Sequence, residues 1–207
     1  SMGLWREVDE EFLTSRGIVV PEDLFDNLPS GNSFIQTAEY FRKRFALAES
    51  SSQIMKIWTE MVAEHYANSV MLKAGVAELL PRIKAAGLKL GLATSNSYEL
   101  AQSSLTFNRV WDYFEAFSTG DADVLGKPFP DIYLNCAKDL RLEPAECIAI
   151  EDTLTGVQAA QAAGMLTLAI YDQDSKKHHD EIKKLAFAFC LDYPEIIQNL
   201  RKLRVDI

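Results

Sequence analysis

The stretch that decides the fold reads CIAIEDTLTG and runs from residue 147 to residue 156. Its four apolar residues, 147–150, predict a buried strand, and the carboxylates Glu151 and Asp152 follow that strand directly. Residues 155–163 are rich in alanine and predict a helix that Gly164 ends. Ligands of parallel sheets bind beyond the carboxyl ends of the strands, so this pair indicates one part of a site. Alternatively, the two carboxylates are solvated turn residues.

The same alternation of strand and helix extends through residues 71–207. Strands are predicted at 88–94, 114–118, 147–150, 166–170 and 187–191, and helices at 76–86, 98–107, 131–140, 155–163 and 194–203. Pro81 lies inside the first of these helices and predicts a kink or a late helix start, because proline lacks a backbone donor. Regular strand–helix alternation is typical of an α/β fold with a doubly wound parallel sheet.

Residues 1–70 have a different pattern, with three amphipathic helices and no strand. The first carries apolar residues at helical spacing and ends at Gly17; the second begins after Asn32 or Ser33; the third follows the serines at 50–52. We therefore expect a separate α-helical domain at 1–70 and an α/β core at 71–207.

Composition excludes several classes of protein. The chain has 207 residues and a formal net charge of −9, which argues against a nucleic-acid partner because phosphate backbones select basic surfaces. No apolar run approaches the length of a membrane span. The three cysteines are an odd number without metal-ligand spacing, and they fit free thiols in a reducing compartment. We expect a cytoplasmic protein with no membrane partner.

Polar residues follow three of the predicted core segments. The first strand ends in Thr94, Ser95 and Asn96, Lys127 lies in the sequence GKPFPD at 126–131, and the third strand ends in Glu151 and Asp152. Each group alone has a structural explanation, as a helix cap, a loop lysine or a turn, but their ordered combination indicates one site.

Phosphoryl transfer requires these groups together. The Thr94 hydroxyl and the amides after it can hold phosphate oxygens, and Lys127 can neutralise the charge of a phosphoryl group and of an attacking carboxylate. Asp152, with Glu151, can hold a hard divalent cation, for which Mg²⁺ is the best candidate.

These segments resemble three motifs of the haloacid-dehalogenase superfamily, in its β-phosphoglucomutase-like branch with a helical cap. The motifs are Thr94 at its strand end, residues 126–131, and residues 151–156 with the alanine-rich helix. The resemblance implies a Mg²⁺-dependent phosphohydrolase, monomeric or weakly dimeric, that acts on a small phosphorylated metabolite through an aspartyl phosphate. Thr94, Lys127 and Asp152 correspond directly to functional residues of the family. The resemblance also implies that Glu151 is a metal ligand or a neighbour of the ligands, and that Asn96 contacts phosphate or substrate.

The family's first motif, an apolar strand followed by D-x-D-G-T, is absent from the 207 residues. Its first aspartate would be the nucleophile and its second the general acid and base. We expect both on a segment of roughly 15 residues upstream of Ser1, judged by ordinary strand and loop lengths. In the family this strand lies between the strands that here end in Thr94 and Asp152.

Substrate choice in relatives comes from the cap, which points to Asn32, Ser33 and Gln36, although helix capping or exposure explains each equally well. Mutases of this branch place a histidine early in the first cap helix, whereas here no histidine precedes His65, which favours a phosphatase. A phosphomutase and an inactive relative with a binding role remain open. A receiver-type phosphoacceptor module would have its acidic residues first, and a dinucleotide-binding protein would have G-x-G-x-x-G after a strand.

Overall fold

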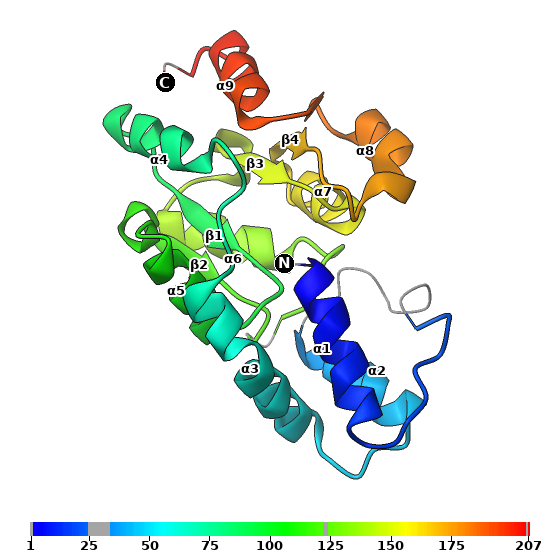
Figure 1. The fold of residues 1–207 in the computed structure, drawn as a ribbon. Coiled ribbons are helices and arrows are strands. Elements are labelled where there is room, and N and C mark those ends of the chain that lie inside the picture. Colours follow the sequence, from blue (N-terminus) through cyan, green and yellow to red (C-terminus); the bar gives the residue numbers. More distant parts are fainter. Residues whose placement is uncertain (1, 25–33, 122–123, 206) are drawn as a thin grey trace.

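The computed structural model describes residues 2–24, 34–121, 124–205 and 207 (Figure 1). It begins with the helices α1 (Met2–Thr14), α2 (Phe34–Arg44) and α3 (Ser51–Asn68), which confirms the three helices that were predicted there. The predicted helix caps Asn32 and Ser33 lie outside the described residues. Ser50 caps α3 in a reciprocal pair with Gln53, which satisfies two backbone donors at the helix start.

Aromatic side chains fill the space between the three N-terminal helices. Trp58 of α3 has edge-to-face contacts with Phe12 of α1 and Phe41 of α2, with ring centroids 5.5 and 5.0 Å apart. Leu100 belongs to the same buried cluster, although it comes from the following part of the chain. The helical layer is therefore attached to the rest of the molecule through its core as well as through the linker after α3.

The remaining elements alternate as predicted. The strands are β1 (Gly91–Ala93), β2 (Ala116–Ser118), β3 (Ile148–Glu151), β4 (Leu166–Ile170) and β5 (Ala188–Cys190). The helices are α4 (Val76–Ala85), α5 (Tyr98–Phe107), α6 (Asp131–Leu140), α7 (Leu154–Ala162), α8 (His179–Leu185) and α9 (Tyr193–Lys202). Helix α8 was not predicted, and α4 runs through Pro81 from its start at Val76, so the late start expected there is wrong.

All strand pairs are parallel, and helices cover both faces of the strands (Figure 1). Ile148 and Ile150 of β3 pack in one cluster with α4 and α9, while Ala149 between them packs against α6 and α7. This alternation is what a strand buried on both faces requires, and it explains the continuous apolar run in the sequence. The α/β architecture that was predicted is confirmed.

The strands form two separate ladders in the described residues, β1 with β2 and β3 with β4 and β5. Consequently one edge of β1 and one edge of β3 have no ladder partner within that part of the chain. The predicted additional strand would lie between these two strands. Its existence stays a prediction, as does the domain boundary at residue 70.

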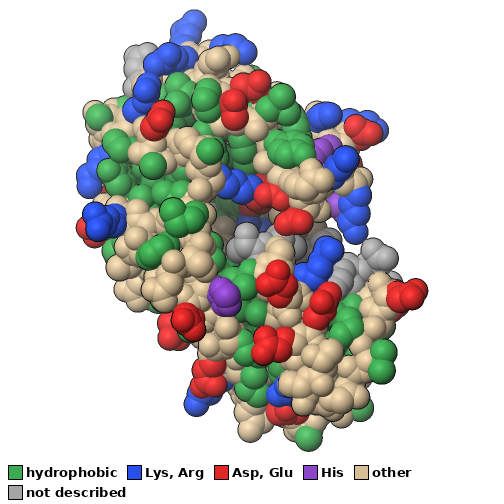
Figure 2. All heavy atoms as spheres, viewed as in Figure 1, with side chains coloured by type: hydrophobic (Ala, Val, Ile, Leu, Met, Phe, Trp, Pro, Cys, Tyr) green, Lys and Arg blue, Asp and Glu red, His purple; other side chains and the backbone are tan. Residues whose placement is uncertain are grey.

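In the space-filling view the helical lobe and the α/β lobe meet at a waist, where acidic and basic side chains face one another (Figure 2). The linker between α3 and α4 passes through this region. Asn108, at the end of α5, accepts a hydrogen bond from the Leu72 amide (3.2 Å) and donates one to the Val70 carbonyl (2.8 Å). The linker is therefore fixed just before Lys73.

Candidate active site

The loop after β1 is held in a tight conformation. The Thr94 amide donates to the Ser118 carbonyl of the neighbouring strand (2.9 Å), and the Asn96 amide donates to the Thr94 hydroxyl (3.2 Å). Gly120 lies so close that a Cβ atom there would be 1.9 Å from the Ser95 carbonyl oxygen. These contacts hold Thr94, Ser95 and Asn96 at the carboxyl end of β1, as the sequence predicted.

Lys127 connects the ends of two strands from different ladders. The side chain is buried, and its ammonium donates to the Ala93 carbonyl in β1 (3.3 Å) and to Glu151 Oε1 in β3. The structure thus brings Lys127 together with Glu151 of the predicted carboxylate pair, while the roles of these residues stay predictions. The ammonium also lies 5.3 Å from the centre of the Tyr133 ring.

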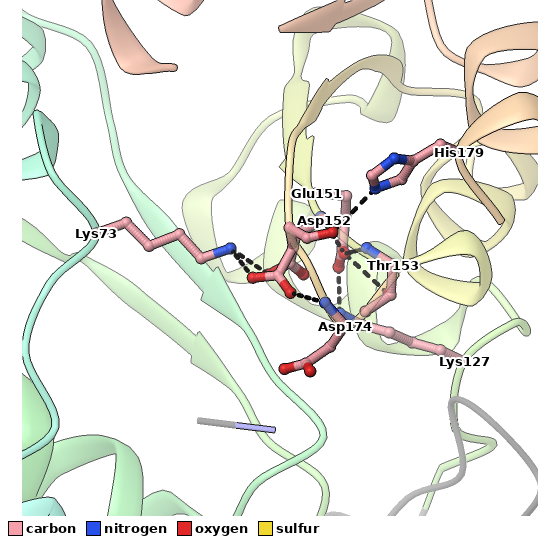
Figure 3. A network of polar contacts seen from close by, with 8 residues as sticks. Lys73, Lys127, Glu151, Asp152, Thr153, Asp174 and His179 are labelled. Carbon is pink, nitrogen blue, oxygen red and sulfur yellow. Dashed lines mark hydrogen bonds and ion pairs between the residues drawn. The ribbon is translucent and has the colours of Figure 1, made fainter. Parts of the chain in front are cut away.

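Glu151 is the centre of a dense hydrogen-bond network (Figure 3). Its Oε1 accepts from Lys127 and from the Tyr133 hydroxyl, while its Oε2 accepts from the Asp152 amide (3.1 Å) and the Thr153 hydroxyl (3.2 Å). Burial disfavours the charged form, but the Lys127 ammonium and these hydrogen bonds hold the pKa of Glu151 below its ordinary value. A Cβ on Gly156 would lie 2.1 Å from this carboxylate, so the helix start is shaped around it.

Asp152 points away from that network and is about one-third exposed. Its Oδ2 accepts a hydrogen bond from the Lys73 ammonium at 2.7 Å (Figure 3). The same ammonium lies 2.5 Å from Oδ2 of Asp172, which follows β4. Two carboxylates from adjacent strands therefore share one cation. Partial burial opposes the charge of Asp172, but Lys73 holds the pKa of that carboxyl below its usual range.

The helical lobe reaches this site through Tyr66, near the end of α3. Its buried hydroxyl accepts hydrogen bonds from the indole of Trp5 in α1 (2.8 Å) and from the side-chain amide of Asn96 (2.9 Å). A predicted phosphate contact is therefore connected to two helices of the first lobe. Gln36 lies half-buried in the first turns of α2, and its part in specificity stays a prediction, as do those of Asn32 and Ser33.

Sequence reasoning missed Lys73, Tyr66 and Asp172. Lys73 interrupts an apolar run in the linker, which was the available signal, while Asp172 follows a predicted strand in the same way as Asp152. Tyr66 gives no signal, because its position near the end of an amphipathic helix is that of a core residue.

The donor set fits a hard cation, although no group of three His, Cys, Asp or Glu side chains gathers at one point in the described ranges. Asp152 and Asp172 already hold an ammonium with carboxylate oxygens. Mg²⁺ is held in proteins by one or two carboxylates, with water and substrate phosphate as the other ligands.

No helix in the part of the chain that the structure describes is long and apolar enough to cross a membrane.

The profile of the haloacid dehalogenase-like hydrolase family matches residues 26–170. The chain belongs to this family. YhcW of Bacillus subtilis (strain 168), whose name classes it with the phosphatases, is 28% identical over 195 residues, which cover 90% of this chain and 88% of YhcW. Hexitol phosphatase B of Escherichia coli (strain K12) is 33% identical over 99 residues, 48% of this chain and 45% of that protein.

A solved structure supports the fold. CbbY from Rhodobacter sphaeroides, crystallised in complex with phosphate, superposes with a TM-score of 0.77 at 23% identity and covers 91% of this chain and 86% of its own. This chain thus shares its fold, an α/β core with a helical lobe, with that solved structure.

Proposed function

We propose that this chain forms the cap, residues 1–70, and most of the core of a Mg²⁺-dependent phosphohydrolase. Its substrate would be a small phosphorylated metabolite such as a sugar phosphate. The observation that carries the proposal is the position of Lys127, which joins the ends of β1 and β3 and so brings the Thr94 loop next to the carboxylates. Family membership and the relatives named as phosphatases support the reaction class.

The residues of the Thr94 loop would bind the phosphate group. The Thr94 hydroxyl accepts from the Asn96 amide and keeps its own proton for a phosphate oxygen. Lys127 would compensate the negative charge of the phosphoryl group and of the attacking carboxylate, with Glu151 behind it fixing the ammonium in place. Because Thr94 and Lys127 are already held in position, the site would not have to reorganise during the reaction.

Asp152 is the better of the two predicted metal ligands. Both oxygens of Glu151 already accept hydrogen bonds, whereas the partly exposed carboxylate of Asp152 pairs with Lys73 alone in the part of the chain that the structure describes. We therefore assign metal binding to Asp152 and positioning of Lys127 to Glu151. A bound Mg²⁺ would supply positive charge to a phosphate oxygen.

The nucleophile would belong to a strand between β1 and β3. The division of the sheet at this place supports that prediction, because both facing edges expose backbone groups that a parallel strand would pair. An aspartate at its carboxyl end would lie between Thr94 and Asp152. Its carboxylate would attack phosphorus, the ester P–O bond would break, and the leaving alkoxide would take a proton from the second aspartate; water would then hydrolyse the aspartyl phosphate.

The cap would determine which substrate enters, with Gln36, Asn32 and Ser33 as specificity candidates. The proposal includes a cytoplasmic location, with which the free thiols Cys136, Cys147 and Cys190 agree.

A screen of phosphorylated metabolites on the natural gene product, with Mg²⁺ and a phosphate-release readout, tests the proposal. Asp152→Asn should abolish turnover, while Asp139→Asn, on the exposed surface of α6, should have no effect. Release of phosphate that survives Asp152→Asn or chelation of divalent cations would contradict the assigned metal role. A bisphosphorylated sugar intermediate would instead identify a phosphomutase.

A further inference from the structure

Lys73 occupies an unusual place for a linker residue. It lies between α3 and α4, more than 70 residues from either of its partners, and yet its ammonium contacts one oxygen of Asp152 and one of Asp172. The lysine side chain is 40% exposed, and the two carboxylates are 35% and 22% exposed. Ion pairs with this exposure are weak, so the lysine can leave for water at little cost.

The backbone that carries Lys73 is fixed on both sides. Asn108 binds the linker at Val70 and Leu72, and Gly75 packs against Tyr193, where a Cβ atom would approach the tyrosine Cβ to 2.8 Å. Lys73 therefore extends from a short segment whose ends are attached to the core. When the ammonium of Lys73 changes its contacts, the linker that leads into the cap gains or loses one attachment.

We propose that Lys73 is an internal counter-cation that neutralises Asp152 and Asp172 when no metal is bound, and that a divalent cation at Asp152 displaces it. The inference rests on the proposed function in one respect, the assignment of metal binding to Asp152.

Electrostatics and coordination chemistry favour the exchange. A divalent ion carries twice the charge of an ammonium and takes carboxylate oxygens as ligands, while the released lysine regains full hydration. Two cations cannot share one Asp152 oxygen without strong repulsion, so lysine and metal exclude each other there. Metal binding would thereby remove the attachment of the linker at residue 73 and leave those at Asn108 and Tyr193, and loss of the metal would restore the attachment to the ends of β3 and β4.

The test compares Lys73→Met with Lys56→Met in titrations of the chain with Mg²⁺ and with Mn²⁺, followed by calorimetry and by Mn²⁺ electron paramagnetic resonance. Methionine keeps the length of the stem and removes the charge. Lys56 pairs only loosely with Glu60 (3.9 Å) on the surface of α3, so its variant has the same net charge without touching the site. Lys73→Met should bind metal roughly three- to tenfold more tightly, as the loss of two weak competing ion pairs predicts, and Lys56→Met as the wild type.

A second measurement follows the linker itself. Hydrogen exchange at residues 70–75 should speed up when Mg²⁺ is added to the wild type and should not respond in Lys73→Met. The inference would be overturned if Lys73→Met bound metal no more tightly than the wild type, or if Mg²⁺ left the hydrogen-exchange rates of residues 70–75 unchanged in the wild type. Since neither readout needs turnover, a protein that releases no phosphate but shows the affinity difference would contradict the proposed function alone.

Discussion

Lys127 and Glu151 form a buried ion pair between the loop before α6 and the end of β3, and both side chains are at most 10% exposed. Glu151 also accepts from Tyr133 and from the Thr153 hydroxyl, whereas Lys127 donates to the Ala93 carbonyl. Desolvation, followed by the charge of Glu151, raises the pKa of Tyr133 well above its ordinary value, so this phenol stays a hydrogen-bond donor. The pair therefore holds the loop before α6 against the ends of β1 and β3.

Breaking one side of this pair should be costly. Glu151→Gln leaves the Lys127 ammonium buried without a counter-charge, and Lys127→Met removes the charge that stabilises Glu151. Each should lower the free energy of unfolding by about 3–5 kcal/mol in urea denaturation. The double variant should lose clearly less than the sum of the two, because it buries no unpaired charge. Additive losses within about 0.5 kcal/mol would mean that the two side chains act independently.

Gly120 should be irreplaceable for the shape of the loop after β1, the proposed phosphate-binding loop. An alanine Cβ would lie 1.9 Å from the Ser95 carbonyl oxygen, a backbone atom that cannot rotate away. We expect Gly120→Ala to cost about 1–3 kcal/mol of stability, as overpacking does, and to weaken the binding of inorganic phosphate, measured by calorimetry. Gly3→Ala is the control, because a Cβ there meets nothing within 4 Å and alanine favours the helix. Unchanged phosphate affinity in Gly120→Ala would separate this loop from phosphate binding.

Several elements could be predicted to the residue because local chemistry marks where they begin. Helix α5 begins after Ser97, which caps it, and β4 begins just after Gly164, whose φ of 83° suits glycine. The predicted strand at 88–94 is longer than β1, because only Gly91–Ala93 pairs with β2. Apolar character marks burial, but a ladder needs a neighbour, and the neighbour is not visible in the strand's own sequence.

The site likewise contains residues that local sequence predicts and residues that only tertiary contacts bring in. Thr94 and Asp152 could be found because each follows directly on a strand, where a topological rule places ligands, and Lys127 because it lies in the loop that leads from β2 to α6. Lys73 and Tyr66 reach the site only through tertiary structure, across separations of 79 residues to Asp152 and 30 residues to Asn96. No local pattern encodes such contacts.

Tyr66 should contribute to substrate binding through Asn96. Tyr66→Phe removes the acceptor shared by Trp5 and Asn96, leaving two donors unpaired near a buried position, at a cost of about 1–3 kcal/mol. In the active natural protein the variant should raise KM more than it lowers kcat, because Asn96 loses its orientation. Tyr40→Phe, whose hydroxyl meets only Arg44 among the contacts described, is the matched control. Indistinguishable kinetics of the two variants would show that Tyr66 serves the fold only.

Asp9 should make the stability of the helical lobe depend on pH. This residue of α1 is 5% exposed, and burial, reinforced by the charge of Glu10, raises the pKa of its carboxyl from 3.8 to about 7. The folded chain thus binds a proton that the unfolded chain has released between about pH 4 and pH 7. Stability from this group is fully present below pH 4, falls as the pH rises to about 7, and stays constant above that value.

The decrease should amount to about 4 kcal/mol, since each pKa unit between the folded and unfolded states corresponds to about 1.4 kcal/mol. Asp9→Asn keeps the shape of the side chain without a titrating proton, so the stability difference between this variant and the wild type should change with pH over that window only. Urea denaturation at pH 4.5, 6 and 8 measures it, with Asp139→Asn, exposed on α6, as a control that should show no such trend. A difference between Asp9→Asn and wild type that is constant from pH 4.5 to 8 would mean that Asp9 is ionised in the folded protein, and that the lobe opens enough at α1 to hydrate it.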